Sequence, residues 1–190
     1  MVHAQSREGQ AFVTELLSGK FEFANIENEH GGRMACAPLW CELFEYAQQH
    51  TSEVKWICVL GECHLLRRGG AKRDNALALK FFKRSAAQQF AHARYRLGMC
   101  FFLGWGVPKD AVLGAIQYQL AAEQGHACAQ KELGWCYAHG VGVETDRSYA
   151  RLWFNKAAEQ GVYDTSGTVE QFNLHAAAAS VASTVAPDRV

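Results

Sequence analysis

No stretch of this chain approaches the run of about 18 apolar residues that a membrane-spanning helix needs. The N-terminus also lacks the apolar run of a secretory signal peptide, because His3, Gln5 and the pair Arg7-Glu8 interrupt it. We therefore expect a soluble, cytoplasmic protein. The 190 residues suit one domain, and the 49% hydrophobic and 20% charged residues are ordinary for a globular chain.

The chain also lacks the motifs that carry chemistry. No Gly-rich phosphate loop follows a strand pattern, and no Ser or Cys nucleophile has a recognised motif around it. Cys136 and His139 lie three residues apart on one expected helix, but no second pair with metal-ligand spacing accompanies them. We therefore predict no catalytic residues, no metal site and no cofactor.

The sequence does contain an internal repeat. Between Leu97 and Gly161 one pattern of residues occurs twice at a spacing of 36. The matching positions are Leu97-Gly98 with Leu133-Gly134, Cys100-Phe101 with Cys136-Tyr137, Gly104 with Gly140, Gly106-Val107 with Gly142-Val143, Asp110 with Asp146, and 121–125 with 157–161. A repeat of this length, helical in each half, is typical of a stacked solenoid whose units cannot bury their apolar faces alone.

Each unit has the pattern of a helical hairpin. Ala129, Leu133 and Tyr137 recur every four residues and so share one helix face. Gly134 falls inside this helix, where glycine costs about 1 kcal/mol relative to alanine, which indicates close approach by a neighbouring helix. Gly140 suits the left-handed closing position, and Asp146 suits the N-cap of the next helix. The predicted fold class is all-α: a right-handed α-solenoid of about four stacked antiparallel helix hairpins, an α-α superhelix.

These residues resemble the Sel-1-like repeat family, a relative of the tetratricopeptide repeat. The family pattern stands here as Leu133-Gly134, Tyr137, Gly140 to Val143, Asp146, Trp153-Phe154 and Lys156 to Gly161. The resemblance implies a binding scaffold, since relatives act as adaptors in protein complexes, in membrane-associated quality control, in cell-wall synthesis regulation and in bacterial host interaction. A few cysteine-rich relatives have been proposed to bind or hydrolyse β-lactam compounds, so a β-lactamase-like hydrolase is the alternative. Because we find no nucleophile with its base, we expect an adaptor and not an enzyme.

The repeat divides the chain into five parts. They are a degenerate N-terminal capping hairpin (1–53), a divergent first repeat (54–90), a second repeat (91–126), a third repeat (127–162), and a C-terminal capping helix with a tail (163–190). The first repeat has one extra residue between Arg67 and Arg73. It also carries Arg67 in place of the helix-closing Gly, His64 in place of the aromatic residue, and Gln89 in place of the final Gly.

Seven cysteines raise the question of disulfides, because cysteine pairs staple each hairpin in some secreted bacterial relatives. Cys63, Cys100 and Cys136 occupy one equivalent position per repeat, and equivalent positions do not usually pair. The count is odd, so we expect buried free thiols. Cys36 and Cys41 are the pair for which a disulfide stays open.

By resemblance to the tetratricopeptide repeat, the residue after each Leu-Gly pair faces the concave surface, which the first helix of each hairpin lines. The predicted partner-binding residues are Glu62, Met99 and Trp135, with Tyr95, Phe102, Lys131 and His139 near them. An apolar or amphipathic peptide or protein segment is the expected ligand. The alternative is that Met99 and Trp135 pack against a flanking repeat.

The formal net charge of zero hides a basic block, because residues 54–96 carry ten Lys and Arg against two Asp and Glu. We predict a basic patch of Arg67, Arg68, Lys72, Arg73, Lys80, Lys83 and Arg84. Either the acidic N-terminal segment folds beside it and neutralises it, or it receives a polyanion, namely an acidic protein tail, a phosphate-bearing lipid or nucleic acid. Among polyanions an acidic partner protein is favoured over nucleic acid, because aromatic residues are not interleaved with these cations.

Overall fold

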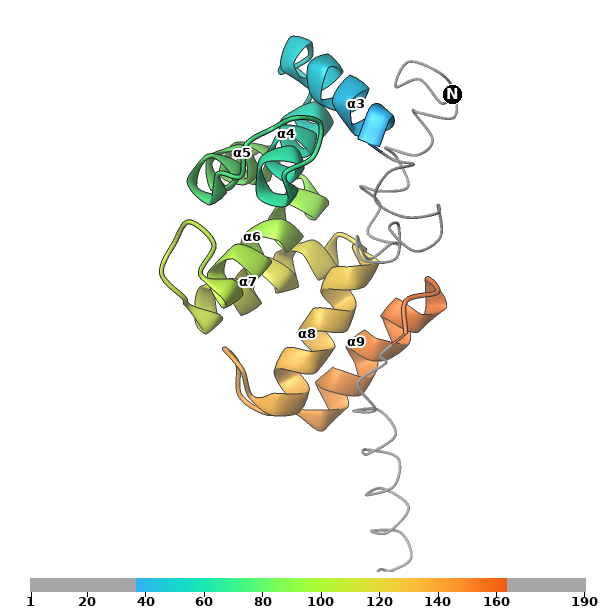
Figure 1. The fold of residues 1–190 in the computed structure, drawn as a ribbon. Helices are drawn as coiled ribbons and strands as arrows, with labels where there is room; N and C mark the ends of the chain where they lie inside the picture. Colours follow the sequence, from blue (N-terminus) through green and yellow to red (C-terminus); the bar gives the residue numbers. More distant parts are fainter. Residues whose placement is uncertain (1–36, 164–190) are drawn as a thin grey trace, which may run out of the picture.

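The computed structural model describes residues 37–163, which form seven helices of 13 residues each and no strand (Figure 1). The helices are α3 (Ala37–Gln49), α4 (Val54–Leu66), α5 (Asn75–Ala87), α6 (Ala91–Leu103), α7 (Ala111–Glu123), α8 (Ala127–His139) and α9 (Arg147–Glu159). None of these seven helices has both the length and the apolar character needed to span a membrane. The all-α class predicted from the repeat is confirmed.

Consecutive helices pack as antiparallel hairpins, α4 with α5, α6 with α7, and α8 with α9. Each hairpin then packs through its first helix on the second helix of the preceding one, and the hairpins form an elongated stack from α3 to α9 (Figure 1). The part of the expected N-terminal capping hairpin that the structure describes is α3, which buries Trp40 and Leu43 against α4. Residues 1–36 of that hairpin, and residues 164–190 of the expected C-terminal capping helix and tail, lie outside the described residues.

In each of the three hairpins from α4 to α9, the second helix begins at an aspartate. Asp74, Asp110 and Asp146 have extended backbones, and each accepts a hydrogen bond from a backbone N–H in the first turn, at 2.8 to 3.0 Å. The carboxylates thereby satisfy N–H groups that have no partner inside the helix. The N-caps predicted for the repeat are confirmed, and the same cap is present in the divergent first hairpin.

The glycine of each Leu-Gly pair lies where the two helices of a hairpin touch. A Cβ built on Gly98 would run into the ring of Tyr118 and lie 3.2 Å from the carbonyl oxygen of Gly114. At Gly61 the same added atom would lie 2.6 Å from Cε1 of Phe82. The close approach inferred from glycine inside a helix is therefore real, and the neighbour is the large aromatic ring of the second helix.

Within residues 37–163, two residues other than glycine have positive φ, and both stand where the first repeat departs from the pattern. Arg67 ends α4 with φ 56°, in the place that Gly104 and Gly140 take at the ends of α6 and α8. Gln89 has φ 64°, where Gly125 has φ 86°. The hairpin therefore keeps its backbone geometry, although two residues other than glycine must adopt the strained left-handed conformation.

The Gly98 contact predicts an unfavourable alanine substitution. Gly98→Ala removes a helical glycine, which alone would stabilise the helix by about 1 kcal/mol, but it drives a methyl group into Tyr118, and such overpacking costs about 1–3 kcal/mol. We expect a net loss of stability in urea unfolding. Gly134→Ala is the milder comparison, because its Cβ would lie 3.0 Å from Phe154. A Gly98→Ala protein more stable than wild type would contradict the packing.

The strained backbone at Gln89 predicts a stabilising substitution. Gln89→Gly should raise the free energy of unfolding by about 1 kcal/mol, because glycine adopts the left-handed conformation without steric penalty. Gly125→Gln, the reverse change at the equivalent position, should lower it by a similar amount. Thermal unfolding of the two variants measures both effects, and two shifts of the same sign would show that φ is not the cause.

Candidate functional site

A cavity of about 340 Å³ opens between α6, α7 and α8, where the second and third repeats meet. We call it the aromatic pocket. Its lining residues are Tyr95, Met99, Phe102, Leu103, Tyr118, Glu132, Trp135 and Cys136. Four of the eight side chains are aromatic rings, and a thioether and a carboxylate lie among them.

The rings of this region form a stacked column. His126 stacks on Tyr95 with centroids 4.7 Å apart, Tyr95 on Tyr118 at 5.8 Å, and Tyr118 on Phe102 at 5.1 Å. Trp135 stacks on His139 at 4.6 Å. Two of these pairs join α6 to α7, and a third joins α6 to the N-cap residue of α8, so the wall of the aromatic pocket is fixed by packing between helices.

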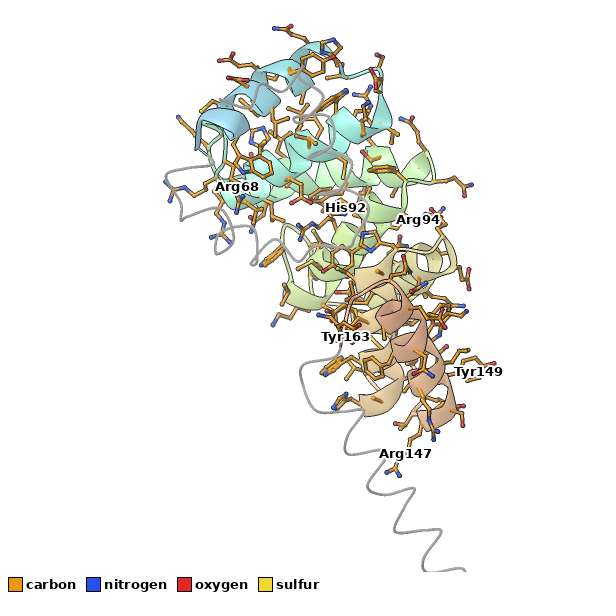
Figure 2. The ribbon with its side chains drawn as sticks, turned by 90° about the vertical axis from the view of Figure 1, so that its right-hand side faces the viewer. Arg68, His92, Arg94, Arg147, Tyr149 and Tyr163 are labelled. Carbon is orange, nitrogen blue, oxygen red and sulfur yellow. The ribbon has the colours of Figure 1, made fainter. Side chains whose placement is uncertain are left out.

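A buried ionic cluster lies directly behind the column, with Glu62 on α4 and His92 and Arg96 on α6. One carboxylate oxygen of Glu62 accepts a hydrogen bond from Nε of Arg96 and another, at 3.0 Å, from Nε2 of His92. All three side chains are at least 96% buried, and Figure 2 shows His92 inside the stack. The charges are therefore paired away from water, which makes the loss of either partner costly.

The hydrogen bonds of the two buried histidines fix their tautomers. The N–H of Ala129 donates to Nδ1 of His126 at 3.2 Å, so His126 carries its proton on Nε2. That Nε2 lies 3.1 Å from Nδ1 of His92, which must accept, so His92 carries its proton on Nε2 and donates it to Glu62. The result is a directed chain from Ala129 through both rings to the carboxylate. It has no place for an additional proton on either ring.

The pKa shifts agree with this chain. Burial alone would raise the pKa of Glu62, but Arg96 and His92 outweigh it and hold that pKa below its usual value. Burial lowers the pKa of His92 even though Glu62 opposes the shift. Burial holds the pKa of His126 well below its usual value, and Arg96 and any positive charge on His92 act in the same direction. Glu62 is thus an anion, and both rings are neutral near pH 7.

The ionic cluster supports the aromatic pocket. His126 stacks on Tyr95, and the Arg96 guanidinium lies 5.6 Å from the centre of the Tyr95 ring. Nη1 of Arg96 also donates to the sulfur of Met99 at 3.2 Å. Two pocket residues therefore rest on a hydrogen-bonded base, which holds them in place before any ligand arrives.

The structure brings together four of the seven residues predicted to bind a partner: Tyr95, Met99, Phe102 and Trp135 line the aromatic pocket. Lys131 is half-buried and lies 3.5 Å from Glu132, and His139 is exposed at the end of α8. Glu62 is different. Its side chain is 0% exposed, so its prediction as a surface contact is wrong, because it is the counter-charge of Arg96.

Several residues of the site were missed from the sequence. Tyr118 and Glu132 line the pocket, and His92, Arg96 and His126 form its base. A signal for Glu62 was present: it is a carboxylate at the position where the other two repeats carry Met99 and Trp135. No feature of their own repeat indicates that His92 and Arg96 are buried and paired with Glu62.

The basic patch is spread along the first hairpin. Arg67, Lys72 and Arg73 lie exposed in or beside the loop from α4 to α5, and Lys80, Lys83 and Arg84 are exposed on α5. The Arg68 guanidinium lies 4.8 Å from the ring centre of Trp40, and Arg84 donates to the carbonyl of Thr51 at 3.3 Å. Residues 1–36 belong to the acidic N-terminal segment that could neutralise the patch, and they lie outside the described residues. Neutralisation therefore stays a prediction.

The cysteines of the described part are free thiols, as expected, and five of them are buried: Cys58, Cys63, Cys100, Cys128 and Cys136. Cys41 is exposed and free, and Cys36 lies outside the described residues. Burial raises the pKa of Cys63, Cys100 and Cys136 to about 12, which keeps them protonated and unreactive.

Among residues 37–163, one group brings together atoms that could bind a metal, since donor atoms of Cys58, Glu62 and His92 lie within 4.8 Å of one another. Burial raises the pKa of the Cys58 thiol well above its usual value. The Arg96 guanidinium already binds the same carboxylate and repels a second cation. The donor set therefore fits an ion pair better than a metal centre.

The stacked hairpins and the pocket between them define an α-solenoid of the helical-repeat class. The sequence model of the Sel1 repeat matches residues 57–90, 91–126 and 129–162. The chain therefore belongs to the Sel1 repeat family, whose members are commonly protein-interaction modules and generally non-catalytic scaffolds. No curated protein matches this chain.

Solved structures of the same class are similar to this chain. A Sel1 repeat protein from Oxalobacter formigenes is 30% identical, with a TM-score of 0.56 over 62% of this chain and 88% of that one. A protective antigen of uropathogenic Escherichia coli with an SLR fold is 27% identical, with a TM-score of 0.58 over 80% of this chain. This chain covers 32% of that antigen. Cysteine rich protein B of Helicobacter pylori, 21% identical with a TM-score of 0.53 over 68% of this chain and 95% of that one, shares the fold.

The neutral histidine pair predicts a fall in stability below about pH 6.5. Both histidine pKa values are lowered in the folded state, so on acidification the unfolded chain takes up protons first. Each histidine then contributes up to about 1.4 kcal/mol of lost stability per pH unit until its folded pKa is reached. Glu62, with its lowered pKa, adds a further loss below its unfolded value of about 4.5.

Urea unfolding across this pH range measures the slope. His126→Gln should flatten it, because one of the two titrating groups is gone. His139→Gln is the control, because that ring is exposed and lies outside the chain of hydrogen bonds. An equal slope in wild type and His126→Gln would contradict the neutral tautomers.

Proposed function

We propose that this chain is a non-catalytic scaffold that binds a segment of a partner protein in the aromatic pocket. The observation that carries the proposal is the pocket itself: Tyr95, Met99, Phe102 and Trp135 line one cavity between two repeats. Membership of the Sel1 repeat family supports the class of function.

The size of the pocket indicates how much of a partner it holds. A volume of about 340 Å³ is at the lower end of ligand pockets, which is room for one large side chain and not for a folded element. We therefore expect the partner to present an extended or helical segment along α6 and α8, with one anchor side chain inserted. Single buried anchors of this kind dominate the free energy of many interfaces.

The chemistry of the walls suits such an anchor. Trp135, Phe102 and Met99 are partly buried, so they combine apolar surface with access from solvent. Methionine and aromatic side chains are enriched in recognition surfaces, because they give a large contact area at low conformational cost. The wall is also held in place from behind by the ionic cluster, so little ordering is needed upon binding.

Peptides selected from a phage-displayed library on the wild-type chain provide the test. Trp135→Ala should weaken the binding of the selected peptides at least tenfold, because an aromatic contact at the centre of an interface is worth about 2 kcal/mol. The measurement is titration calorimetry with the synthetic peptides.

Trp105→Ala is the matched control. Trp105 is also partly buried, but it packs on the core of the first repeat and does not line the pocket. Its removal should leave the affinity unchanged. The opposite pattern, with Trp105→Ala abolishing binding and Trp135→Ala harmless, would place the binding surface on the loops and overturn the proposal.

A further inference from the structure

The Tyr118 side chain brings a hydroxyl group to the wall of the aromatic pocket. Tyr118 lines the pocket, is 5% exposed, and stacks its ring on both Tyr95 and Phe102. Its hydroxyl forms no hydrogen bond with any residue from 37 to 163. The hydroxyl groups of buried side chains are nearly always hydrogen-bonded, so this one calls for an explanation.

The groups around this hydroxyl place it on the cavity side of the ring. One edge of the Tyr118 ring faces Gly98 of α6. Glu132 and Cys136 of α8 act electrostatically on the hydroxyl, and both residues line the same pocket. The hydroxyl is also not sealed from solvent. It therefore lies toward α8, where a side chain inserted into the pocket would reach it.

The hydroxyl keeps its proton at neutral pH. Burial raises the pKa of Tyr118 well above its usual value, and Glu132 acts in the same direction. A protonated phenol both donates and accepts a hydrogen bond. The hydroxyl of a second phenol matches both roles, whereas the indole of tryptophan only donates.

The other pocket walls limit which anchor can satisfy the hydroxyl. An apolar anchor would cover it without bonding it, which leaves a desolvated polar group without a partner. A carboxylate would be repelled by Glu132, and an ammonium group would find Glu132 already paired with Lys131 at 3.5 Å. A neutral phenol instead packs its ring against Phe102 and Trp135 and brings a hydroxyl to that of Tyr118.

We propose that the anchor entering the aromatic pocket is a tyrosine side chain of the partner segment, with its hydroxyl hydrogen-bonded to the hydroxyl of Tyr118 and its ring against the aromatic wall. This inference rests on the proposed function and names the chemistry of the anchor. It assigns Tyr118 as the residue that selects tyrosine over phenylalanine. A site built to bond a hydroxyl rejects the analogue that lacks it, because the polar group of the site is then left without a partner.

The direct test compares N-acetyltyrosinamide with N-acetylphenylalaninamide, which differ only in the phenol hydroxyl. We expect the tyrosine amide to bind the wild-type chain about tenfold more tightly, because only this ligand satisfies the Tyr118 hydroxyl. A pocket without a polar contact gives the opposite order, since the phenylalanine ring gains more from leaving water. Titrations followed by the NMR chemical shifts of the backbone amides of α6 and α8 measure both affinities.

Tyr118→Phe is the critical variant, since it keeps the ring that faces Gly98 and removes only the hydroxyl. It should weaken the tyrosine amide about tenfold and leave the phenylalanine amide unchanged. Its melting temperature should match that of wild type, because the hydroxyl has no partner within residues 37–163. Tyr137→Phe is the matched control: Tyr137 stacks on Tyr149 and does not line the pocket, so this variant should change neither affinity.

The outcomes separate this inference from the proposed function. The tyrosine anchor is overturned by equal binding of the two amides, by tighter binding of the phenylalanine amide, by no binding of the tyrosine amide, or by a clear loss of stability in Tyr118→Phe. Selected peptides that are sensitive to Trp135→Ala would still support the scaffold in each of these cases. If the peptides are insensitive to Trp135→Ala, the proposed function fails as well.

The selected peptides extend the test to a complete ligand. Replacing their tyrosine by phenylalanine should weaken binding to the wild-type chain about tenfold and have no effect on binding to Tyr118→Phe, because the two hydroxyl groups act as one pair. Peptides that lack tyrosine, or that bind equally well after the replacement, would contradict the tyrosine anchor.

Discussion

The buried pair of Glu62 and Arg96 is the interaction on which the middle of the stack depends. A guanidinium sealed from water needs a counter-charge, and the carboxylate of Glu62 on the preceding hairpin supplies one. The same carboxylate orients His92, and His92 orients His126, the N-cap of α8. The first helices of three consecutive hairpins, α4, α6 and α8, are therefore held in register by polar interactions inside an otherwise apolar stack.

This arrangement explains why the pocket forms where it does. Tyr95 and Met99 project from the same helix as Arg96, and both contact the ionic cluster. On the other side, the close approach at Gly98 brings the Tyr118 ring of α7 against α6 and completes the wall. The pocket thus follows from two features of the hairpin packing, a glycine that admits a ring and a buried charge that fixes the helix beside it.

The sequence predicted the elements of the fold well because each is set by local chemistry. Asp110 caps α7, Gly104 closes α6, and Gly98 marks a close contact, and each needs only its own repeat to be understood. The site was predicted in part for the same reason: Met99 and Trp135 follow the repeat pattern into the pocket.

The role of Glu62 could not be predicted in this way. Comparing repeats aligns Glu62 with Met99 and Trp135, but its partners His92 and Arg96 lie 30 and 34 residues further along the chain. They meet only when two hairpins stack, so the contact depends on three-dimensional neighbours and not on equivalent positions. Glu132 was missed for a similar reason, since its place in the pocket requires α6, α7 and α8 together.

The chain of hydrogen bonds from Ala129 to Glu62 also restricts how the array can change in length. In repeat proteins that interact only through similar apolar faces, units can be gained or lost with little effect on their neighbours. Here the insertion of one hairpin between α5 and α6 would separate a buried anion from its cation, and removal of the α6–α7 hairpin would leave Glu62 without Arg96 and His92. The three repeats can therefore be duplicated together as one block. A single repeat cannot be inserted into or removed from this block without disrupting the buried ion pair or this chain of hydrogen bonds.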